Sequence, residues 1–158
     1  MNAETKPETE KKSEFNIQRL YVKDVSFEAP ETPKIFQTEW KPDVNLDLNI
    51  ETHSLGDNHH EVILKVTVTT KLADKTAFLV EVSQAGIFTI KGFNNDQFQA
   101  MLGSFCPNLL FPYAREAVSD LTVRGGFPPL YLIPINFDAL YQQQLEKEKQ
   151  SGTTTQVQ

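Results

Sequence analysis

Three histidines are the first candidates for chemistry in this sequence, because imidazole binds metal ions and transfers protons near neutral pH. His53, His59 and His60 lie around a predicted turn between two strands. Adjacent residues on a strand point to opposite faces, so His59 and His60 cannot easily hold one ion. No cysteine or spaced set of carboxylates joins the three. We therefore predict surface-loop histidines and no metal site.

The single cysteine, Cys106, is the only candidate thiol nucleophile. A reactive thiolate needs a nearby base or a positive environment, and no histidine lies in the same half of the chain. Cys106 precedes a proline, at a predicted helix break, and is expected to be a small, buried packing residue. One cysteine cannot form an internal disulfide, which fits a reducing compartment.

A glycine pair at residues 125–126 is the only candidate phosphate-binding loop. It is followed by Phe-Pro-Pro, and not by the helix start and lysine that a nucleotide loop requires. The sequence thus predicts no catalytic residue, no metal and no cofactor.

Carboxylates are concentrated between residues 24 and 57, where Lys34 and Lys41 are the only basic residues. General acid–base catalysis needs paired carboxylates in a shielded pocket, whereas several of these alternate with apolar residues, as on the wet face of a sheet. Two interpretations stay open: a solvated acidic face, or a rigid docking surface for a basic partner. The residues are Asp24, Glu28, Glu31, Glu39, Asp43, Asp47, Glu51 and Asp57.

Aromatic and apolar residues gather in two segments that no regular element explains. The connection over residues 29–42 has three prolines, and residues 125–134 are rich in glycine and proline. Either the two loops fold over the sheet and complete its core, or they line an exposed apolar groove, which normally marks a binding site. Such a groove would suit apolar segments of other chains. The residues are Phe36, Trp40, Phe127, Leu130, Tyr131 and Leu132.

Composition narrows the class of protein further. The 158 residues include 21 acidic and 15 basic side chains, for a net charge of -6, and 39% are hydrophobic. This balance argues against nucleic-acid binding and against docking on an anionic membrane. No apolar run approaches the ~20 residues of a membrane helix, and the first residues lack the apolar region of a secretory signal. We expect one domain in a soluble, cytoplasmic protein.

The first half of the chain has the alternation of β-strands. Four strands are predicted over residues 15–27, 43–51, 61–72 and 76–90. The alternation slips within the first, which predicts a bulge. A short turn at residues 73–75 makes the last two an antiparallel hairpin.

The second half has helical spacing. Asn94 or Asn95 is expected to cap a helix over residues 96–105, which Pro107 interrupts. A continuation over 111–124 is expected to end at a left-handed Gly125. Asn136 is expected to cap a last helix that carries Phe137, Leu140, Tyr141 and Leu145 on one face. The order predicts an α+β fold, a four-stranded antiparallel sheet followed by two helices, with sheet and helices segregated. Residues 1–14 and 146–158 are expected to be disordered tails around a domain over 15–145.

Four runs of this sequence are distinctive: RLYVKDVSFEAP (19–30), GIF (86–88), CPNLLFPYARE (106–116) and GFPPLYLIPINFDAL (126–140). They resemble SecB, the bacterial protein-export chaperone family. The resemblance covers about residues 15–145, and the long runs are far more specific than a short motif.

The resemblance implies a chaperone without catalysis, ATP or cofactor. SecB-type proteins form tetramers of two dimers, hold precursor proteins unfolded and pass them to the ATPase SecA at the translocon. The family's SecA contact falls on Asp24, Glu28, Leu79 and Glu81. The client groove that the resemblance implies comprises Phe36, Trp40, Val44, Leu46, Leu48, Phe127, Leu130, Leu132, Phe137, Leu140 and Tyr141. The C-terminal tail, also a SecA contact in the family, differs here in being rich in Gln and Thr.

One alternative function uses the same residues. A carrier of small apolar, lipid-like ligands would place the same loops over a closed pocket and would work as a monomer. An enzyme would need a shielded polar constellation, which the sequence does not indicate.

Overall fold

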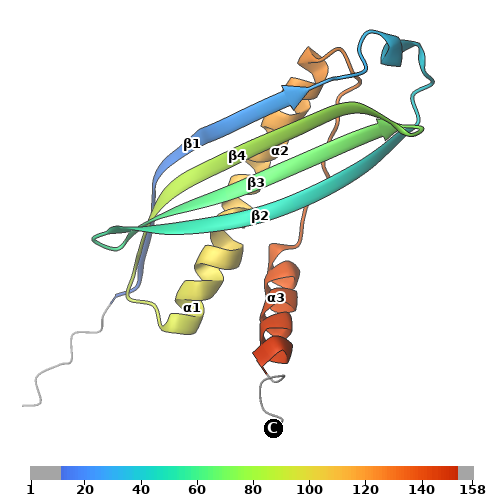
Figure 1. Ribbon diagram of the computed structural model, residues 1–158. Coiled ribbons are helices and arrows are strands. Elements are labelled where there is room, and N and C mark those ends of the chain that lie inside the picture. The colour runs from blue at the N-terminus through green and yellow to red at the C-terminus, as the bar shows by residue number, and fades with distance from the viewer. Residues whose placement is uncertain (1–11, 153–158) are drawn as a thin grey trace, which may run out of the picture.

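The computed structural model describes residues 12–152 and forms a single layer of strands with helices beside it (Figure 1). A 3₁₀ turn, η1, lies between the first two strands, and a π-helical turn, η2, lies between α1 and α2. The elements are β1 (Glu14–Glu28), η1 (Lys34–Gln37), β2 (Pro42–Gly56), β3 (His59–Leu72), β4 (Lys75–Lys91), α1 (Asn95–Ala100), η2 (Met101–Phe105), α2 (Cys106–Arg124) and α3 (Phe137–Gly152).

The four strands make one antiparallel sheet in the order β1-β4-β3-β2, so β1 and β2 are its edges. The helices lie on one side of this sheet (Figure 1). The predicted α+β fold with segregated sheet and helices is therefore confirmed. Among the described residues, no helix or strand covers the other face of the sheet. We call the covered side the inner face and the bare side the outer face.

The strands run further than the alternation of hydrophobic residues predicts. The second strand, expected to end at residue 51, continues to Gly56 and forms a hairpin with β3. Asp57 and Asn58 adopt φ values of 52° and 61°, a left-handed conformation that these short polar side chains tolerate, and so close a tight turn. The turn therefore determines where this hairpin ends. The alternation of hydrophobic residues could not show this, because polar residues interrupt it before the strand ends.

The predicted irregularity of the first strand is confirmed. The pairing of β1 with β4 shifts register twice, between Ile17 and Arg19 and between Val22 and Asp24. Each shift leaves one extra residue on β1, so the alternation of its side chains slips at that point.

The hydrophobic core lies between α2 and the inner face of the two central strands. On α2, Leu110, Ala114 and Val118 follow each other at one-turn spacing and are fully buried, as are Val66 on β3 and Val80 on β4. Burial of a side chain of this size contributes about 1.5–3 kcal/mol to stability. This core fixes the sheet on the helices and so positions the residues described below.

The predicted helix break at Pro107 is wrong. The chain is helical from Asn95 to Arg124, and η2 lies just before the proline, with the Cys106 N–H bonding Met101 O five residues back. Proline lacks the N–H that an α-helix would use, and the wider π turn carries the helix past this position. Asn94 is confirmed as the cap, since its side-chain oxygen accepts from the Gln97 N–H at 2.8 Å.

Two further boundaries differ from the sequence prediction. The left-handed glycine is Gly126, with φ of 87°, whereas Gly125 has a helical φ of -72°. The last helix begins as predicted, with Asn136 Oδ1 accepting from the Ala139 N–H at 3.0 Å. It continues to Gly152, so residues 146–152 of the expected tail are helical. Residues 1–11 and 153–158 lie outside the described structure, and no helix within 12–152 is long and apolar enough to cross a membrane.

Candidate binding surfaces

Two loops distant in sequence meet in an aromatic cluster at the end of the sheet where β1 ends and β4 begins. The Phe127 ring lies 5.1 Å from the Phe36 ring and 6.0 Å from the Trp40 ring, centroid to centroid. Phe127 itself is buried, with 6% of its surface exposed, and is 5.0 Å from Phe78 of the core. Phe36 and Trp40 keep 52% and 37% of their surfaces exposed. Phe127 thus anchors two aromatic side chains that remain open to solvent, and we call these three residues the aromatic cluster.

Local sequence explains how the loops approach so closely. The short η1 turn buries Ile35, at 2% exposure, and directs the next residue, Phe36, outward. At Gly126, a Cβ atom would lie 3.3 Å from the Phe36 ring, and the positive φ there already favours glycine. At Gly125, a Cβ atom would lie only 2.3 Å from the Phe27 ring. The glycine pair therefore allows the second loop to lie directly on the aromatic side chains.

The remaining residues of the predicted groove divide between surface and core. Leu46 and Leu48 of β2 are half-buried against the core, and Val44 is exposed. On the helical side, Leu130 and Tyr141 are half-buried and Leu140 is exposed. Leu132 and Phe137 are buried at 8% and 2% exposure, and the Phe137 ring packs edge-on against Phe111. The interpretation that the loops complete the core holds for Phe127 and Leu132, which are buried, as is Phe137 at the start of α3, whereas Phe36 and Trp40 stay exposed.

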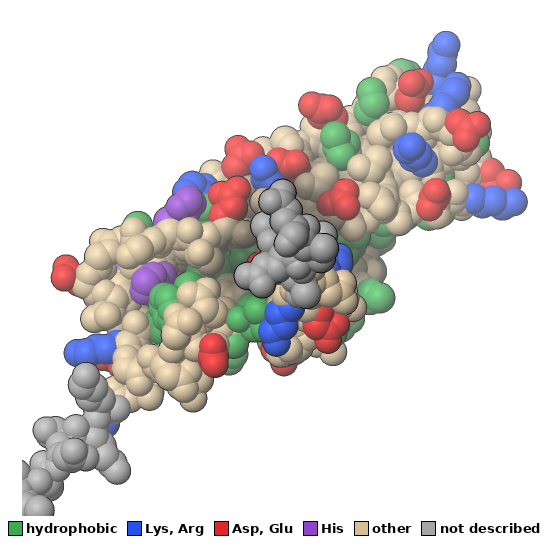
Figure 2. Space-filling view, turned by 60° about the horizontal axis from the view of Figure 1, so that its bottom comes forward, with side chains coloured by type: hydrophobic (Ala, Val, Ile, Leu, Met, Phe, Trp, Pro, Cys, Tyr) green, Lys and Arg blue, Asp and Glu red, His purple; other side chains and the backbone are tan. Residues whose placement is uncertain are grey.

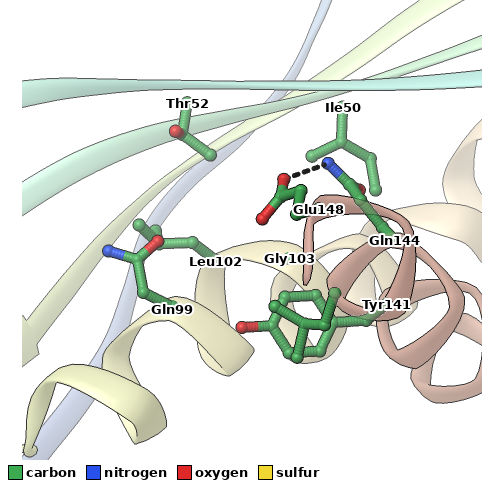
Figure 3. A pocket seen from close by; sticks show the side chains of 9 residues that line it. Ile50, Thr52, Gln99, Leu102, Gly103, Tyr141, Gln144 and Glu148 are labelled. Carbon is green, nitrogen blue, oxygen red and sulfur yellow. Dashed lines mark hydrogen bonds between the residues drawn. The ribbon is translucent and has the colours of Figure 1, made fainter. Parts of the chain in front are cut away.

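A hollow between β2 and α3 contains residues that the sequence analysis did not assign to the groove. Its volume is about 400 Å³, and Figure 3 shows Ile50 and Thr52 of the strand facing Leu102 of η2 and Tyr141 of α3. Gly103 lies under Tyr141, where a Cβ atom would approach the ring to 2.7 Å. Ile50 continues the alternation of Leu46 and Leu48, so that pattern was the signal that could have found it. Figure 2 shows hydrophobic side chains gathered where the sheet meets the helices.

Strand register brings the four predicted SecA-contact residues together on the outer face. Glu28 pairs with Leu79, and the next residue on this face of β1, Ser26, pairs with Glu81. Phe27 and Val80 pair with each other and face the core, so their neighbours point the opposite way. Asp24 follows on the same face, opposite Ser83. We call Asp24, Glu28, Leu79 and Glu81 the acidic sheet surface.

The acids of this surface differ in their partners. Glu81 forms an ion pair with Lys65 at 3.4 Å and accepts a hydrogen bond from Thr67 at 3.2 Å. Asp24 and Glu28 are exposed and form no ion pair within residues 12–152. These two carboxylates are therefore free to accept bonds from a basic partner.

A further carboxylate on the outer face, Glu61, also has partners within the chain. Lys23 Nζ lies 3.0 Å from Glu61 Oε1 and 3.1 Å from Oε2, and the Tyr21 hydroxyl donates a hydrogen bond to the same carboxylate. The bond from Tyr21, helped by Lys23, lowers the pKa of Glu61. Burial and the bond to Glu61 raise the pKa of Tyr21 to about 12. The sequence analysis did not predict this network, which depends on the bulge in β1.

The candidate catalytic and metal-binding residues form no reactive site. Cys106 is fully buried, and burial raises the pKa of its thiol to about 12, so the prediction of a packing residue is confirmed. The histidines lie on strands and not in a surface loop: His53 is on β2, and His60 on β3 is half-buried with its ring 5.0 Å from the Phe98 ring. Burial lowers the pKa of His60. Within the described chain, no three His, Cys, Asp or Glu side chains are grouped to hold a metal ion.

The profile of the family described as preprotein translocase subunit SecB matches residues 8–148, most of the chain. This chain belongs to the SecB family. The resemblance of the four sequence runs to SecB is therefore confirmed.

Curated relatives carry the same description over nearly their whole length. Each is a protein-export protein SecB. The protein of Nitrosococcus oceani is 54% identical over 89% of this chain and 87% of its own length. The proteins of Hahella chejuensis and Methylococcus capsulatus are 53% and 56% identical, over 90% and 88% of this chain and 89% and 90% of their own lengths. SecB is a non-enzymatic protein-export chaperone family, and the chain is a chaperone of this class.

A solved structure shares the fold. It is a SecB-like chaperone of Mycobacterium tuberculosis, solved in complex with a peptide from an antitoxin, with a TM-score of 0.65. The match covers 77% of this chain and 90% of that one at 19% sequence identity. This likeness confirms the arrangement of the sheet and helices.

Proposed function

We propose that this SecB protein holds unfolded secretory precursors through the aromatic cluster and the neighbouring β2 and α3 side chains, and delivers them to SecA through the acidic sheet surface. The observation that carries the proposal is the exposure of Phe36 and Trp40 on a buried Phe127. Large apolar side chains that stay exposed in one place mark a binding surface. Contacts of this kind depend on apolar area and not on sequence, at roughly 25 cal/mol per Å² buried.

The hollow between β2 and α3 supports the same proposal. Its lining mixes apolar side chains such as Ile50 and Leu145 with polar ones such as Gln99 and Gln144. A mixed and open lining suits an extended peptide, which presents both apolar side chains and backbone amides. The peptide held by the SecB-like chaperone of Mycobacterium tuberculosis is consistent with peptide binding by this fold.

Assembly into a tetramer of two dimers belongs to the same proposal. Edge strand β1 exposes Ile17, Val22 and Val25 at 46%, 50% and 46% of their surfaces. An edge strand with exposed apolar side chains is suited to burial against a second copy. Several grooves on one assembly raise the effective concentration of binding sites along one client, so weak local contacts give tight overall holding. We place this assembly in the cytoplasm, where precursors await export.

A refolding experiment tests the chaperone proposal. A slowly folding secretory precursor is diluted from denaturant with and without the SecB protein, while fluorescence follows refolding and light scattering gives the mass of the complex. We expect arrested refolding, a complex of four subunits with one precursor, and no complex with native precursor. Unchanged refolding and a bare monomer would contradict the proposal and would direct the search to small lipid-like ligands.

A further inference from the structure

The bulge in β1 places a lysine directly beside the acidic sheet surface. Val22 pairs with Gln84 and Asp24 with Ser83, so Lys23 is the extra residue and has no partner on β4. Lys23 and Asp24 both line one hollow of about 230 Å³ on the outer face. A lysine adjacent to an exposed carboxylate would ordinarily neutralise part of its charge, and Lys23 would then oppose the binding of a basic partner.

Glu61 of β3 binds this lysine. Both Glu61 oxygens lie within 3.1 Å of Lys23 Nζ, and the Tyr21 hydroxyl orients the same carboxylate. The Glu61 side chain is only 13% exposed, against 47% for Lys23, so the lysine reaches inward to a partly buried acceptor. Water screens such a contact less than it screens a pair of fully exposed groups.

The other basic side chains that line the hollow have acidic partners of their own. Lys65 pairs with Glu81 at 3.4 Å, and His53 lies 3.8 Å from Glu51. Lys23 is thus the cation beside Asp24 whose position depends on Glu61.

We propose that Glu61 is a positioning residue of the acidic sheet surface, which holds Lys23 away from Asp24 and so keeps Asp24 available to a basic docking partner. The inference rests on the proposed docking of SecA to this surface. Glu61 acts through Lys23 and makes no contact with the partner. Its lowered pKa is consistent with an acid that stays ionised and holds the lysine throughout the neutral range.

Variants that replace a charged side chain by a neutral amide test this role. A second substitution should restore the binding that the first one weakens, which would not happen if Glu61 were purely structural. With Glu61→Gln, Lys23 is released towards Asp24, and we expect SecA to bind about fivefold more weakly at low salt. With Lys23→Gln added to Glu61→Gln, the released cation is gone, and affinity should return to within about twofold of the wild type. Lys23→Gln alone should bind at least as tightly as the wild type. A double variant that binds as weakly as Glu61→Gln would overturn the inference, because Glu61 would then act as a structural residue or contact SecA itself.

A variant matched in net charge separates the effect of releasing Lys23 from the effect of overall charge. Glu61→Gln with Lys71→Gln has the same net charge as the rescue variant, but the lysine that it removes lies on β3, opposite Asp43. We expect no rescue from this pair, and equal rescue would mean that net charge alone is responsible. Thermal unfolding of every variant checks the fold. Should Glu61→Gln fail to fold, Glu61→Asp keeps the charge but shortens the reach to Lys23, and we expect an intermediate loss that Lys23→Gln again corrects.

A readout on the free protein separates this inference from the proposed function. The carbon resonance of the Asp24 carboxyl group, measured by NMR at neutral pH, should move in Glu61→Gln and return in the double variant with Lys23→Gln. Tyr21→Phe removes the bond that orients Glu61 but keeps the carboxylate that binds Lys23, and should move the resonance less than Glu61→Gln does. A resonance unchanged in Glu61→Gln would overturn the inference even if SecA binds as proposed. A shifted and rescued resonance without any SecA binding by the wild type would instead contradict the proposed docking.

Discussion

The acidic sheet surface and the aromatic cluster are built in different ways. The first consists of side chains on β1 and β4, whose positions follow from antiparallel register and alternation. The second joins two loops about 90 residues apart, held by the contact of Phe127 with Phe36 and Trp40. One surface is rigid and charged, whereas the other is apolar and carried by connecting segments. The difference indicates that a basic partner and an unfolded client need not compete for the same residues.

Charge reversal on the sheet should have the largest effect and should be confined to one surface. We expect Asp24→Lys with Glu28→Lys to weaken SecA binding by about 100-fold or more, because two unpaired acceptors become repulsive cations. Refolding arrest of a precursor should be unchanged. Titration calorimetry with SecA and the refolding assay measure the two effects. Loss of both activities would show that the surfaces are not separate or that the variant misfolds, and circular dichroism distinguishes these outcomes.

Truncation of the aromatic cluster should have the converse effect. We expect Phe36→Ala with Trp40→Ala to weaken client holding by about tenfold, as is typical of exposed aromatic anchors, with SecA binding retained. Leu55→Ala is the matched control, since Leu55 is also exposed, at 53%, but lies at the far hairpin of β2. Precursor binding should be unchanged in this control. Equal losses in both variants would mean that exposed apolar area anywhere on the chain holds clients.

The salt dependence of binding should distinguish the acidic sheet surface from the aromatic cluster in the wild-type protein. The screening length falls from about 10 Å at 0.1 M salt to about 3 Å at 1 M. Affinity for SecA should therefore fall steeply with salt, whereas apolar client holding should change little. Parallel titrations over this range measure both slopes. Equal slopes would contradict the assignment of charge to one surface and apolar contact to the other.

A glycine substitution should produce the smallest effect. Gly126→Ala introduces a Cβ at φ of 87°, next to Phe36, and should lower the free energy of unfolding by about 1–2 kcal/mol. Client holding should fall a few-fold because the loop moves off the aromatic cluster. Gly56→Ala is the control, with φ of 83° and no neighbouring atom within 4 Å. Chemical denaturation of Gly56→Ala should show a similar loss of stability, whereas its client holding should be unchanged. An equal loss of client holding in Gly56→Ala would mean that lower stability alone explains the result for Gly126→Ala.

The outer face could be predicted more fully than the loops. The resemblance to SecB implied that Asp24, Glu28, Leu79 and Glu81 form one surface, and the antiparallel register of β1 and β4 brings them to the same face. The reach of Lys23 to Glu61 was not predictable in the same way, because it needs the strand order as well as the bulge.

Loop and helix details depended on contacts that a single sequence does not display. Phe127 and Phe137 have the same residue type and similar surroundings in the sequence as exposed aromatics, yet the tertiary fold buries both. The helix break expected at Pro107 was wrong because a π turn in η2 absorbs the proline. The helix beyond residue 145 was missed because residues 146–152 contain no hydrophobic side chain and so leave no hydrophobic period.

Fluorescence of Trp40, the one tryptophan in the chain, tests the client surface most directly. Trp40 lies in the aromatic cluster with 37% of its surface exposed. An unfolded precursor without tryptophan is added while emission is recorded, and light scattering confirms the complex. We predict a blue shift of the emission as the client covers the indole ring, and no shift with native precursor. A complex that forms with unchanged Trp40 emission would show that clients bind elsewhere and would contradict the account.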